Sequence, residues 1–390
     1  MILNYSPFVS SNCVLSEARI ASYLGYGFYT IGPCGEELFG AISLNLSADD
    51  LSAFHYRHVS NSIVLQLKSG RTLEDIALDR ARAYVCSIKD PVTGGKHCSI
   101  GSINHKKEFI VTSTLSSQAP SAVGRALAIP LSAKLLGQNS NFSSSAISYV
   151  SVGDGSVNNA HFLSAMNFSK YCEYRGIKCP VVFVVSDNNL CISLKGQNWI
   201  NEFQKGFAAI NKRESADNLQ FANGNDFIDI YDKSKLAIDY TRKFSRPSLL
   251  IVNQLPRRFG HAATDRQLAY LSKEEIENQI SRDPLAATCS AAIAGNLFSE
   301  TEFESKVRQM MQIVENAFDI AVEEEKITSR EALIVSNSKP LIGAVDITLH
   351  RTLTPTRGES MRKHMTSAYD ELLKNNNECI YIGEDVEHGG

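Results

Sequence analysis

The sequence lacks the features that define several protein classes. Its nine cysteines are scattered, odd in number and contain no C-x-x-C pair, which favours reduced thiols over a disulfide framework or a zinc site. No apolar run approaches the roughly 20 residues that span a bilayer. The first residues show neither a secretory core nor an arginine-rich transit pattern. We therefore expect no membrane segment and a cytoplasmic location, or the mitochondrial matrix in a eukaryote.

A strong charge of one sign is also missing. The 390 residues carry a formal net charge of −3 with a sequence pI near 6.3, so we expect neither nucleic acid nor an anionic membrane as a partner. The chain is long for a single core, and 43% of it is apolar. Two or more globular domains are the resulting expectation.

Three short apolar runs, each followed by a helical pattern, predict a parallel sheet. They span residues 147–152, 181–185 and 249–252, far enough apart for crossover helices. This alternation is typical of an α/β fold with helices on both faces of a parallel sheet. Further along, a capping box of Ser299 and Glu302 predicts the start of a long helix. We expect its apolar stripe to pack in the core; the stripe consists of Phe303, Val307, Met310, Val314, Phe318 and Ala321.

The composition and periodicity of the sequence change after Lys326. Residues 329–350 are mixed and contain proline, as in a connector, and they are followed by a helix pattern over about 359–374 and a predicted strand, "ECIYIGEDV". One helix and one strand cannot bury a core by themselves. We therefore predict one domain over residues 1–328, a linker over 329–350, and the incomplete start of a second domain over 351–390.

Polar residues follow the first two predicted strands. Asp154 lies between Gly153 and Gly155 in "VSVGDGS", and Asn188 follows "VVFVVSD". Ligands of a parallel sheet bind beyond the carboxyl ends of its strands. The glycines permit a tight turn, and we expect Ser156 to begin a helix whose N-terminus attracts an anion. A carboxylate and an amide oxygen beside an anion suit Mg²⁺, so the pattern predicts a magnesium-bound diphosphate, although aspartate and glycine are also ordinary turn residues.

The spacing of the two motifs resembles a known arrangement. Gly155 and Asn188 are separated by 32 residues, 156 to 187, similar to the thiamine diphosphate motif of a G-D-G, a crossover, and N-N or N-G. The chain resembles the α part of the thiamine diphosphate-dependent first component of 2-oxoacid dehydrogenase complexes, especially forms in which the α and β parts are fused. The resemblance covers about residues 27–285. Near the end, "IGEDVEHGG" resembles the start of the β part, as if the chain were truncated early in that part.

The resemblance implies a metal site with three protein oxygens. The magnesium ligands fall on Asp154, Asn188 and the main-chain carbonyl of Leu190. The family usually has N-G-Y-A-I-S where this chain has "NNLCIS". Asn189 is one of the few residue types that tolerates the left-handed turn normally supplied by glycine, so this departure removes no ligand.

Other residues receive roles only from the resemblance. Tyr56 and Arg57 in "FHYRHVS" fall on the pair that binds the diphosphate, whereas an isolated arginine is mostly exposed. Ser113 and Leu115 fall on positions that flank the aminopyrimidine, although Leu115 also fits a plain core. The catalytic histidine falls on His261 in "RRFGHAATD", with Arg257 or Arg258 nearby. The implied cofactor-binding residues are Tyr56, Arg57, Ser113, Leu115, Gly153, Asp154, Gly155, Ser156 and Asn188.

The resemblance also implies an activity and partners. A 2-oxo acid, branched-chain by analogy with fused forms, would be oxidatively decarboxylated with thiamine diphosphate and Mg²⁺. Its acyl group would pass to the lipoyl domain of an acyltransferase component with help from His261. A β part or β subunit would supply the activating glutamate. The 390 residues alone are therefore expected to be inactive and, through their uncovered interface, to form an oligomer. Two alternatives remain: a truncated non-enzymatic fragment, or a Mg²⁺-dependent phosphate- or nucleotide-binding α/β enzyme.

Overall fold

The structure is a computed structural model that describes residues 5–101, 107–207, 218–262, 265–335, 358 and 360–381. The chain forms two compact units. One comprises Met1–Ala128 and Ser145–Ile327, and the other comprises Ile129–Ser144 and Thr328–Gly390. Within the described residues, no helix combines the length and the apolar character that crossing a bilayer requires.

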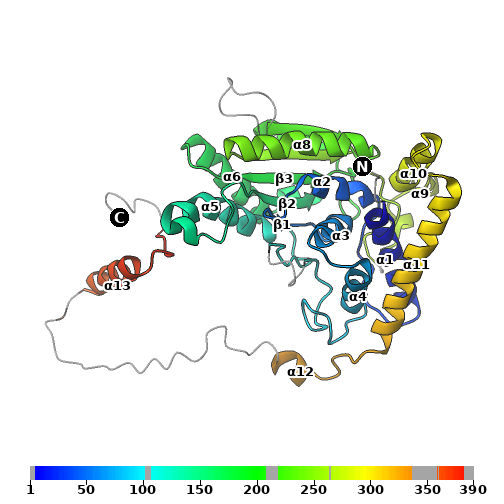
Figure 1. Ribbon diagram of the computed structural model, residues 1–390, viewed down its shortest axis with the longest axis horizontal. Coiled ribbons are helices and arrows are strands. Elements are labelled where there is room, and N and C mark those ends of the chain that lie inside the picture. Colours follow the sequence, from blue (N-terminus) through cyan, green and yellow to red (C-terminus); the bar gives the residue numbers. More distant parts are fainter. Residues whose placement is uncertain are drawn as a thin grey trace. The chain divides into compact units, whose positions relative to one another are not determined.

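The first unit is built on a sheet of five strands that all run parallel, in the order β1-β2-β3-β5-β4. Figure 1 labels the three neighbouring strands β1, β2 and β3. The strands are β1 (Leu51–Ala53), β2 (Ser148–Gly153), β3 (Val181–Ser186), β4 (Leu219–Asn223) and β5 (Ser248–Asn253). The three predicted strands correspond to β2, β3 and β5 within one residue at each end, whereas β1 and β4 were not predicted. The α/β fold with a parallel sheet is confirmed.

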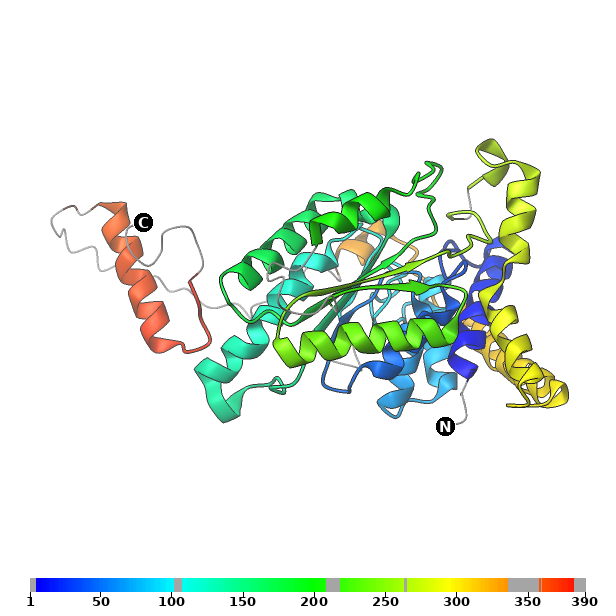
Figure 2. The ribbon, with the colours of Figure 1, turned by 90° about the horizontal axis from the view of Figure 1, so that it is seen from above.

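Helices flank the sheet, and Figure 2 shows the strands running between α6 and α8. The helices of this unit are α1 (Ser6–Tyr23), α2 (Gly40–Asn45), α3 (Val59–Lys68), α4 (Leu73–Tyr84), α6 (Ala160–Tyr174), α7 (Trp199–Phe203), α8 (Phe227–Phe244), α9 (Lys273–Ser281), α10 (Pro284–Ala294) and α11 (Glu300–Glu323), together with most of α5 (Gln118–Leu136). Short 3-10 helices η1 (Glu37–Phe39) and η3 (Asp154–Asn158) precede α2 and α6.

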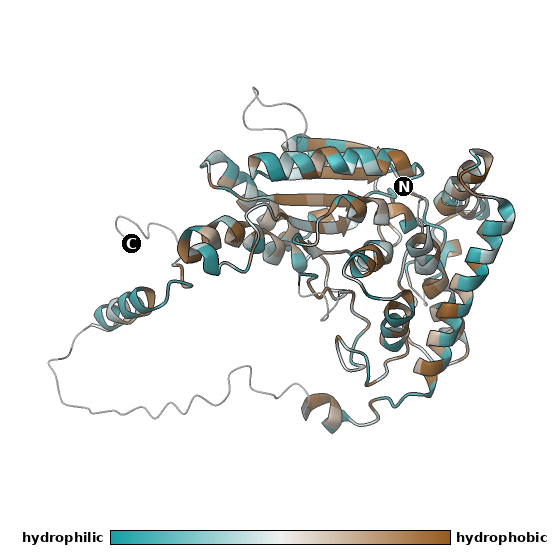
Figure 3. Cartoon of the chain, viewed as in Figure 1, coloured by the Kyte–Doolittle hydropathy of each residue, from teal (hydrophilic) through white to brown (hydrophobic). Residues whose placement is uncertain are grey.

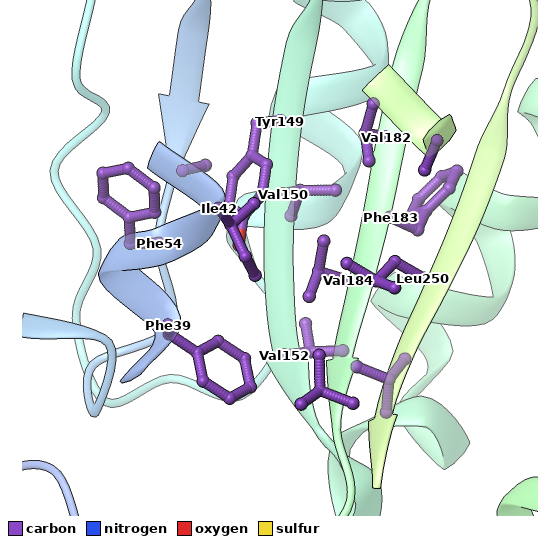
Figure 4. Packing of buried hydrophobic residues seen from close by; sticks show 14 of the residues in the cluster. Phe39, Ile42, Phe54, Tyr149, Val150, Val152, Val182, Phe183, Val184 and Leu250 are labelled. Atoms are coloured by element: carbon purple, nitrogen blue, oxygen red, sulfur yellow. The ribbon is translucent and has the colours of Figure 1, made fainter. Parts of the chain in front are cut away.

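The central strands are buried on both faces, which explains their nearly continuous apolar sequences. Every residue of β3 is buried, and so is every residue of β2 and β5 except the last of each. Side chains from these strands pack against residues of η1 and α2, as the close view in Figure 4 shows for Phe39, Ile42, Val152 and Val184. Figure 3 colours the sheet brown and much of the outer helical surface teal. β-branched side chains suit such a doubly covered sheet.

A second apolar cluster joins α1, α4 and α11. The predicted capping box is confirmed, since Ser299 and Glu302 each bond to the other's main chain at the start of α11. Most of the predicted stripe is buried, from Met310 onward. Phe303 and Val307 are only half-buried, because they line a groove between α1, α10 and α11 instead of the cluster with α4.

Residues beyond 327 contain two helices, α12 (Arg330–Val335) and α13 (Met361–Asn375). Helix α13 matches the helix predicted over about 359–374. The strand predicted in "ECIYIGEDV" is wrong for residues 378–381, which adopt no regular structure, and the rest of it lies outside the described residues. A strand needs a neighbour for its main-chain hydrogen bonds, and the described residues of this unit contain none. The predicted domain and linker boundaries stay a prediction.

Candidate active site

The G-D-G turn follows the end of β2 directly. Asp154 opens the 3-10 helix η3, and α6 begins only at Ala160, where the side chain of Asn159 accepts a hydrogen bond from the main-chain N–H of His161 at 2.9 Å. The expectation that Ser156 begins an α-helix is therefore wrong, because the extended backbone of Asn159 separates the 3-10 turn from the helix that it caps. The turn has no room for a side chain at Gly155, since an added Cβ would lie 2.8 Å from Cys191 Sγ.

Oxygen atoms from the ends of two neighbouring strands converge beside this turn. Asp154 Oδ2 and Asn188 Oδ1 both accept a hydrogen bond from the main-chain N–H of Leu190, at 3.1 and 3.0 Å. The loop after β3 turns back sharply because Asn189 adopts a φ of +57°, the left-handed conformation predicted for it. The parallel pairing of β2 with β3 places Gly153 opposite Ser186, which brings the two loops to the same edge of the sheet.

Negatively charged side chains predominate at this edge of the sheet. Burial, and then the neighbouring carboxylate of Asp187, raise the pKa of Asp154 to about 7, and burial also raises the pKa of Asp187. Neither carboxylate forms an ion pair with a described residue. His, Cys, Asp and Glu side chains alone form no metal-binding group of three in the described part of the chain. A cation here would therefore depend on amide and main-chain oxygens as well, and these oxygens fit a hard cation such as Mg²⁺.

All eleven residues that the sequence assigned to the site line one pocket of about 440 Å³. Their grouping is a finding, while the role of each stays a prediction. Arg57 is only 5% exposed, so it is not an ordinary surface arginine, and Leu115 is 43% exposed, so it is not a core residue. The residues that the sequence did not assign but that also line the pocket are Ile31, Glu36, His55, Ser186, Cys191, Ile192 and Arg257.

Arg57 connects the pocket wall to His261. Its Nη2 donates to the main-chain carbonyl of His261 at 2.8 Å and lies 3.0 Å from Nδ1 of the same residue, and its Nη1 donates to the carbonyl of Gly32 at 3.0 Å. Because arginine can only donate, Nδ1 of His261 is the acceptor and the ring proton is on Nε2. Burial, then the charges of Arg57 and Arg257, lower the pKa of His261 to about 4. The imidazole is therefore neutral near pH 7.

The segment that carries His261 is held by a network of charged groups. Arg257 donates from Nη1 to the carbonyl of Cys191 at 2.5 Å and from Nη2 to the hydroxyl of Tyr270. Asp265 Oδ2 accepts hydrogen bonds from the main-chain N–H of His261 and from Tyr270, both at 2.6 Å. The sequence did not predict the parts played by Asp265 and Tyr270, and only the clustering of charged and aromatic residues around His261 could have suggested them.

Arg258 anchors the same segment to a distant part of the chain. Its guanidinium forms ion pairs with Glu37 and Asp283, and its main-chain N–H donates to the carbonyl of Cys34 at 2.8 Å. Glu37 is fully buried, and burial raises the pKa of its carboxyl while Arg258 lowers it. These contacts hold the chain in place three residues before His261.

Comparison with known proteins identifies the family. A model described as "Dehydrogenase E1 component" matches residues 25–330. The α subunit of 2-oxoisovalerate dehydrogenase from Bacillus subtilis is 28% identical over 261 residues, which are 65% of this chain and 71% of that relative. The pyruvate dehydrogenase E1 component α subunit from Rickettsia bellii is 29% identical over 178 residues, which are 45% of this chain and 51% of that relative. The matched region spans about half the length of the latter protein. The family model covers well over half of this chain, so the chain belongs to the dehydrogenase E1 component family, as its resemblance to thiamine diphosphate-dependent 2-oxoacid dehydrogenase α parts predicted.

Proposed function

We propose that this chain is the α part of a 2-oxoacid dehydrogenase first component that binds thiamine diphosphate with Mg²⁺. One observation carries the proposal. Asp154 Oδ2 and Asn188 Oδ1 converge on the main-chain N–H of Leu190, in a pocket that Arg57 and His261 also line. Membership of the dehydrogenase E1 component family favours this function over a Mg²⁺-dependent phosphate- or nucleotide-binding enzyme. It likewise favours an enzyme component over a non-enzymatic fragment.

In this proposal each part of the pocket holds one part of the ligand. Asp154, Asn188 and the carbonyl of Leu190 hold the metal ion, and the buried guanidinium of Arg57, beside Tyr56, faces the diphosphate. Arginine suits this task because its planar fork donates to two phosphate oxygens at once. Thiamine diphosphate, when bound, supplies the nucleophilic carbon and the electron sink for loss of carbon dioxide. The protein's share is binding, orientation and proton transfer.

His261 serves as a neutral hydrogen-bond donor in this proposal. Arg57 donates to Nδ1, so the Nε2–H of the ring is free to donate to an oxygen or sulfur anion that develops in the pocket. The low pKa of the ring keeps it uncharged at physiological pH, and a donated hydrogen bond stabilises a developing negative charge most where water is excluded. We assign to this hydrogen bond from His261 the stabilisation of the negative charge that develops as the acyl group passes to a lipoyl domain.

The substrate and the partner complete the proposal. We propose a branched-chain 2-oxo acid, which is supported by the similarity to a 2-oxoisovalerate dehydrogenase α subunit over 71% of that protein and by apolar lining from Ile31, Leu115 and Ile192. A β part, on the same polypeptide or on a separate chain, would complete the site and supply the activating carboxylate. Comparing kcat/KM for 2-oxoisovalerate and pyruvate in the assembled enzyme would decide the substrate class, and a preference for pyruvate would refute the branched-chain assignment.

Calorimetry on the full chain tests the cofactor site. We expect Mg²⁺-dependent binding of thiamine diphosphate by the wild type and at least tenfold weaker binding by Asp154→Ala, because the metal loses its charged ligand. Asp239→Asn, which changes a half-exposed carboxylate paired with Lys235, is the matched control and should bind like the wild type. Thermal melts in EDTA check folding, and Asp154→Ala should melt no lower than the wild type there, since it removes a buried charge. Unchanged affinity in Asp154→Ala would exclude Asp154 from the site.

A further inference from the structure

We infer that His55 is a further binding residue of this pocket, which donates a hydrogen bond from Nε2 to the diphosphate end of the ligand. The inference rests on the proposed function and deepens it. The family resemblance assigns roles to Tyr56 and Arg57, the two residues that follow, but none to His55. The placement of the His55 ring, its hydrogen bonds and its neighbours carry the assignment.

His55 lies between the two elements that the proposal places around the diphosphate. It is 5% exposed and lines the pocket. Its ring packs against the ring of Tyr56 with the centroids 4.0 Å apart and the planes tilted by 37°, and its other neighbour is the turn that carries Asp154. A Cβ added at Gly153 would lie 3.7 Å from His55 Nε2 and 3.8 Å from Cε1. The Nε2 edge of the imidazole therefore faces the G-D-G turn.

The hydrogen bonds around His55 involve its main chain, and its ring has no hydrogen-bond partner at Nδ1 among the described residues. Its main-chain N–H donates to Ser151 Oγ at 2.9 Å, and Ser151 Oγ also lies 2.8 Å from Nδ1 of His58. Nδ1 of His55 is buried and has no hydrogen-bond partner among the described residues. A proton on Nδ1 would be a buried donor without an acceptor, which is unfavourable. The proton is better placed on Nε2, where a ligand oxygen at the pocket wall can accept it.

The neighbouring groups make an anion the natural acceptor. Arg57, Arg257 and His261 line the same pocket, and two of these are permanent cations. Burial lowers the pKa of His55 itself well below its usual value, with His58, Arg57 and His261 adding to the effect. The ring is therefore neutral and adds one directed N–H donor without adding another buried charge. A hydrogen bond to a charged acceptor corresponds to roughly a tenfold to hundredfold change in affinity.

Two substitutions of His55 separate the donor from the volume of the ring. The amide nitrogen of His55→Gln can reach the position of Nε2 and donate, whereas His55→Leu fills a similar volume without a donor. We expect calorimetry on the full chain with Mg²⁺ to show thiamine diphosphate binding within about threefold of the wild type for His55→Gln and at least tenfold weaker for His55→Leu. The affinity for inorganic pyrophosphate should fall by the same factor in His55→Leu, because the proposed contact is to the diphosphate.

His58→Leu is the control for general disturbance of the packing. His58 is as buried as His55 and bonds to the same Ser151, but it does not line the pocket. The His58→Leu variant should have a lower melting temperature but nearly unchanged affinities for thiamine diphosphate and inorganic pyrophosphate. Equal affinities in wild type and His55→Leu would overturn the inference, and so would a loss confined to thiamine diphosphate, which would place the contact at the pyrimidine. A wild type that fails to bind thiamine diphosphate with Mg²⁺ even when the β part is present would instead overturn the proposed function, and the inference with it.

Discussion

Replacing Arg258 with methionine should destabilise the fold by a predictable amount. The substitution removes the cation that faces Glu37, whose side chain is 0% exposed, while the Arg258 side chain is 6% exposed. Removing one partner of a buried ion pair costs about 3–5 kcal/mol, because the other charge stays buried without compensation. A hydrogen bond from Asn12 to Glu37 Oε1 at 3.2 Å remains, and Glu37 can take up a proton. We therefore expect a loss of about 3 kcal/mol in the free energy of unfolding, at the lower end of that range.

The loss should depend on pH in a defined direction. Burial raises the pKa of Glu37 and Arg258 opposes this shift. Arg258→Met should therefore raise the pKa of Glu37 in the folded protein further above its unfolded value of about 4.3. A carboxyl with a raised folded pKa binds protons more tightly in the folded state, so its destabilising effect grows as the pH rises through that pKa. The deficit of the variant relative to wild type should be largest near pH 8 and should shrink toward pH 5.

Urea unfolding followed by circular dichroism at both pH values measures the deficit. Arg308→Met is the matched control, because Arg308 and Glu304 are 80% and 62% exposed with 4.0 Å between their charged atoms, and such pairs contribute less than about 1 kcal/mol. The double variant Glu37→Met with Arg258→Met should recover much of the loss, since it leaves no buried charge. A deficit as small as that of Arg308→Met, or one that does not change with pH, would refute the reasoning.

Three further variants test local features. Gly155→Ala should destabilise the fold by about 1–3 kcal/mol through contact with Cys191, and adding Cys191→Ala should restore part of the melting temperature; no recovery would mean that the strain lies elsewhere. Ser299→Ala removes the cap of α11 and should reduce the free energy of unfolding by about 1 kcal/mol in urea, whereas no change would show that the capping box is dispensable. Arg57→Met should raise the pKa of His261 from about 4 toward its ordinary value in an NMR titration, though incompletely because burial remains the first cause, and an unchanged pKa would contradict the contact between the two side chains.

The sequence predicted the strands in the middle of the sheet and missed those at its edges, for one physical reason. β2, β3 and β5 are covered on both faces, so nearly all their residues must be apolar, and such runs are visible in a sequence. β1 and β4 are the two edge strands. β1 has only three residues, and β4 mixes buried and exposed positions. An edge strand forms because a neighbour is already in place, and nothing in its own residues requires it.

The candidate site likewise contains contacts that the sequence could predict and contacts that it could not. Asp154 and Asn188 could be paired from the sequence because parallel strands end at one edge, so a local motif carries information about distant geometry. The contact of Arg258 with Glu37 joins residues that are 221 positions apart, and His55 meets Gly153 only because β1 pairs with β2. Such contacts depend on how whole elements pack. They leave no periodicity and no spacing that a single sequence could reveal.

The pocket carries opposite charges on two of its walls, and this division constrains its ligand more than any single residue does. One wall has the carboxylate of Asp154, with the carboxylate of Asp187 behind it, and burial raises the pKa of both groups. The other has the buried guanidinium groups of Arg57 and Arg257. A bare anion would satisfy the arginines and repel the carboxylates, and a bare divalent cation would do the reverse. A magnesium ion joined to a diphosphate satisfies both walls at once, so metal and anion are expected to bind as a pair, each strengthening the other by the charge that it neutralises.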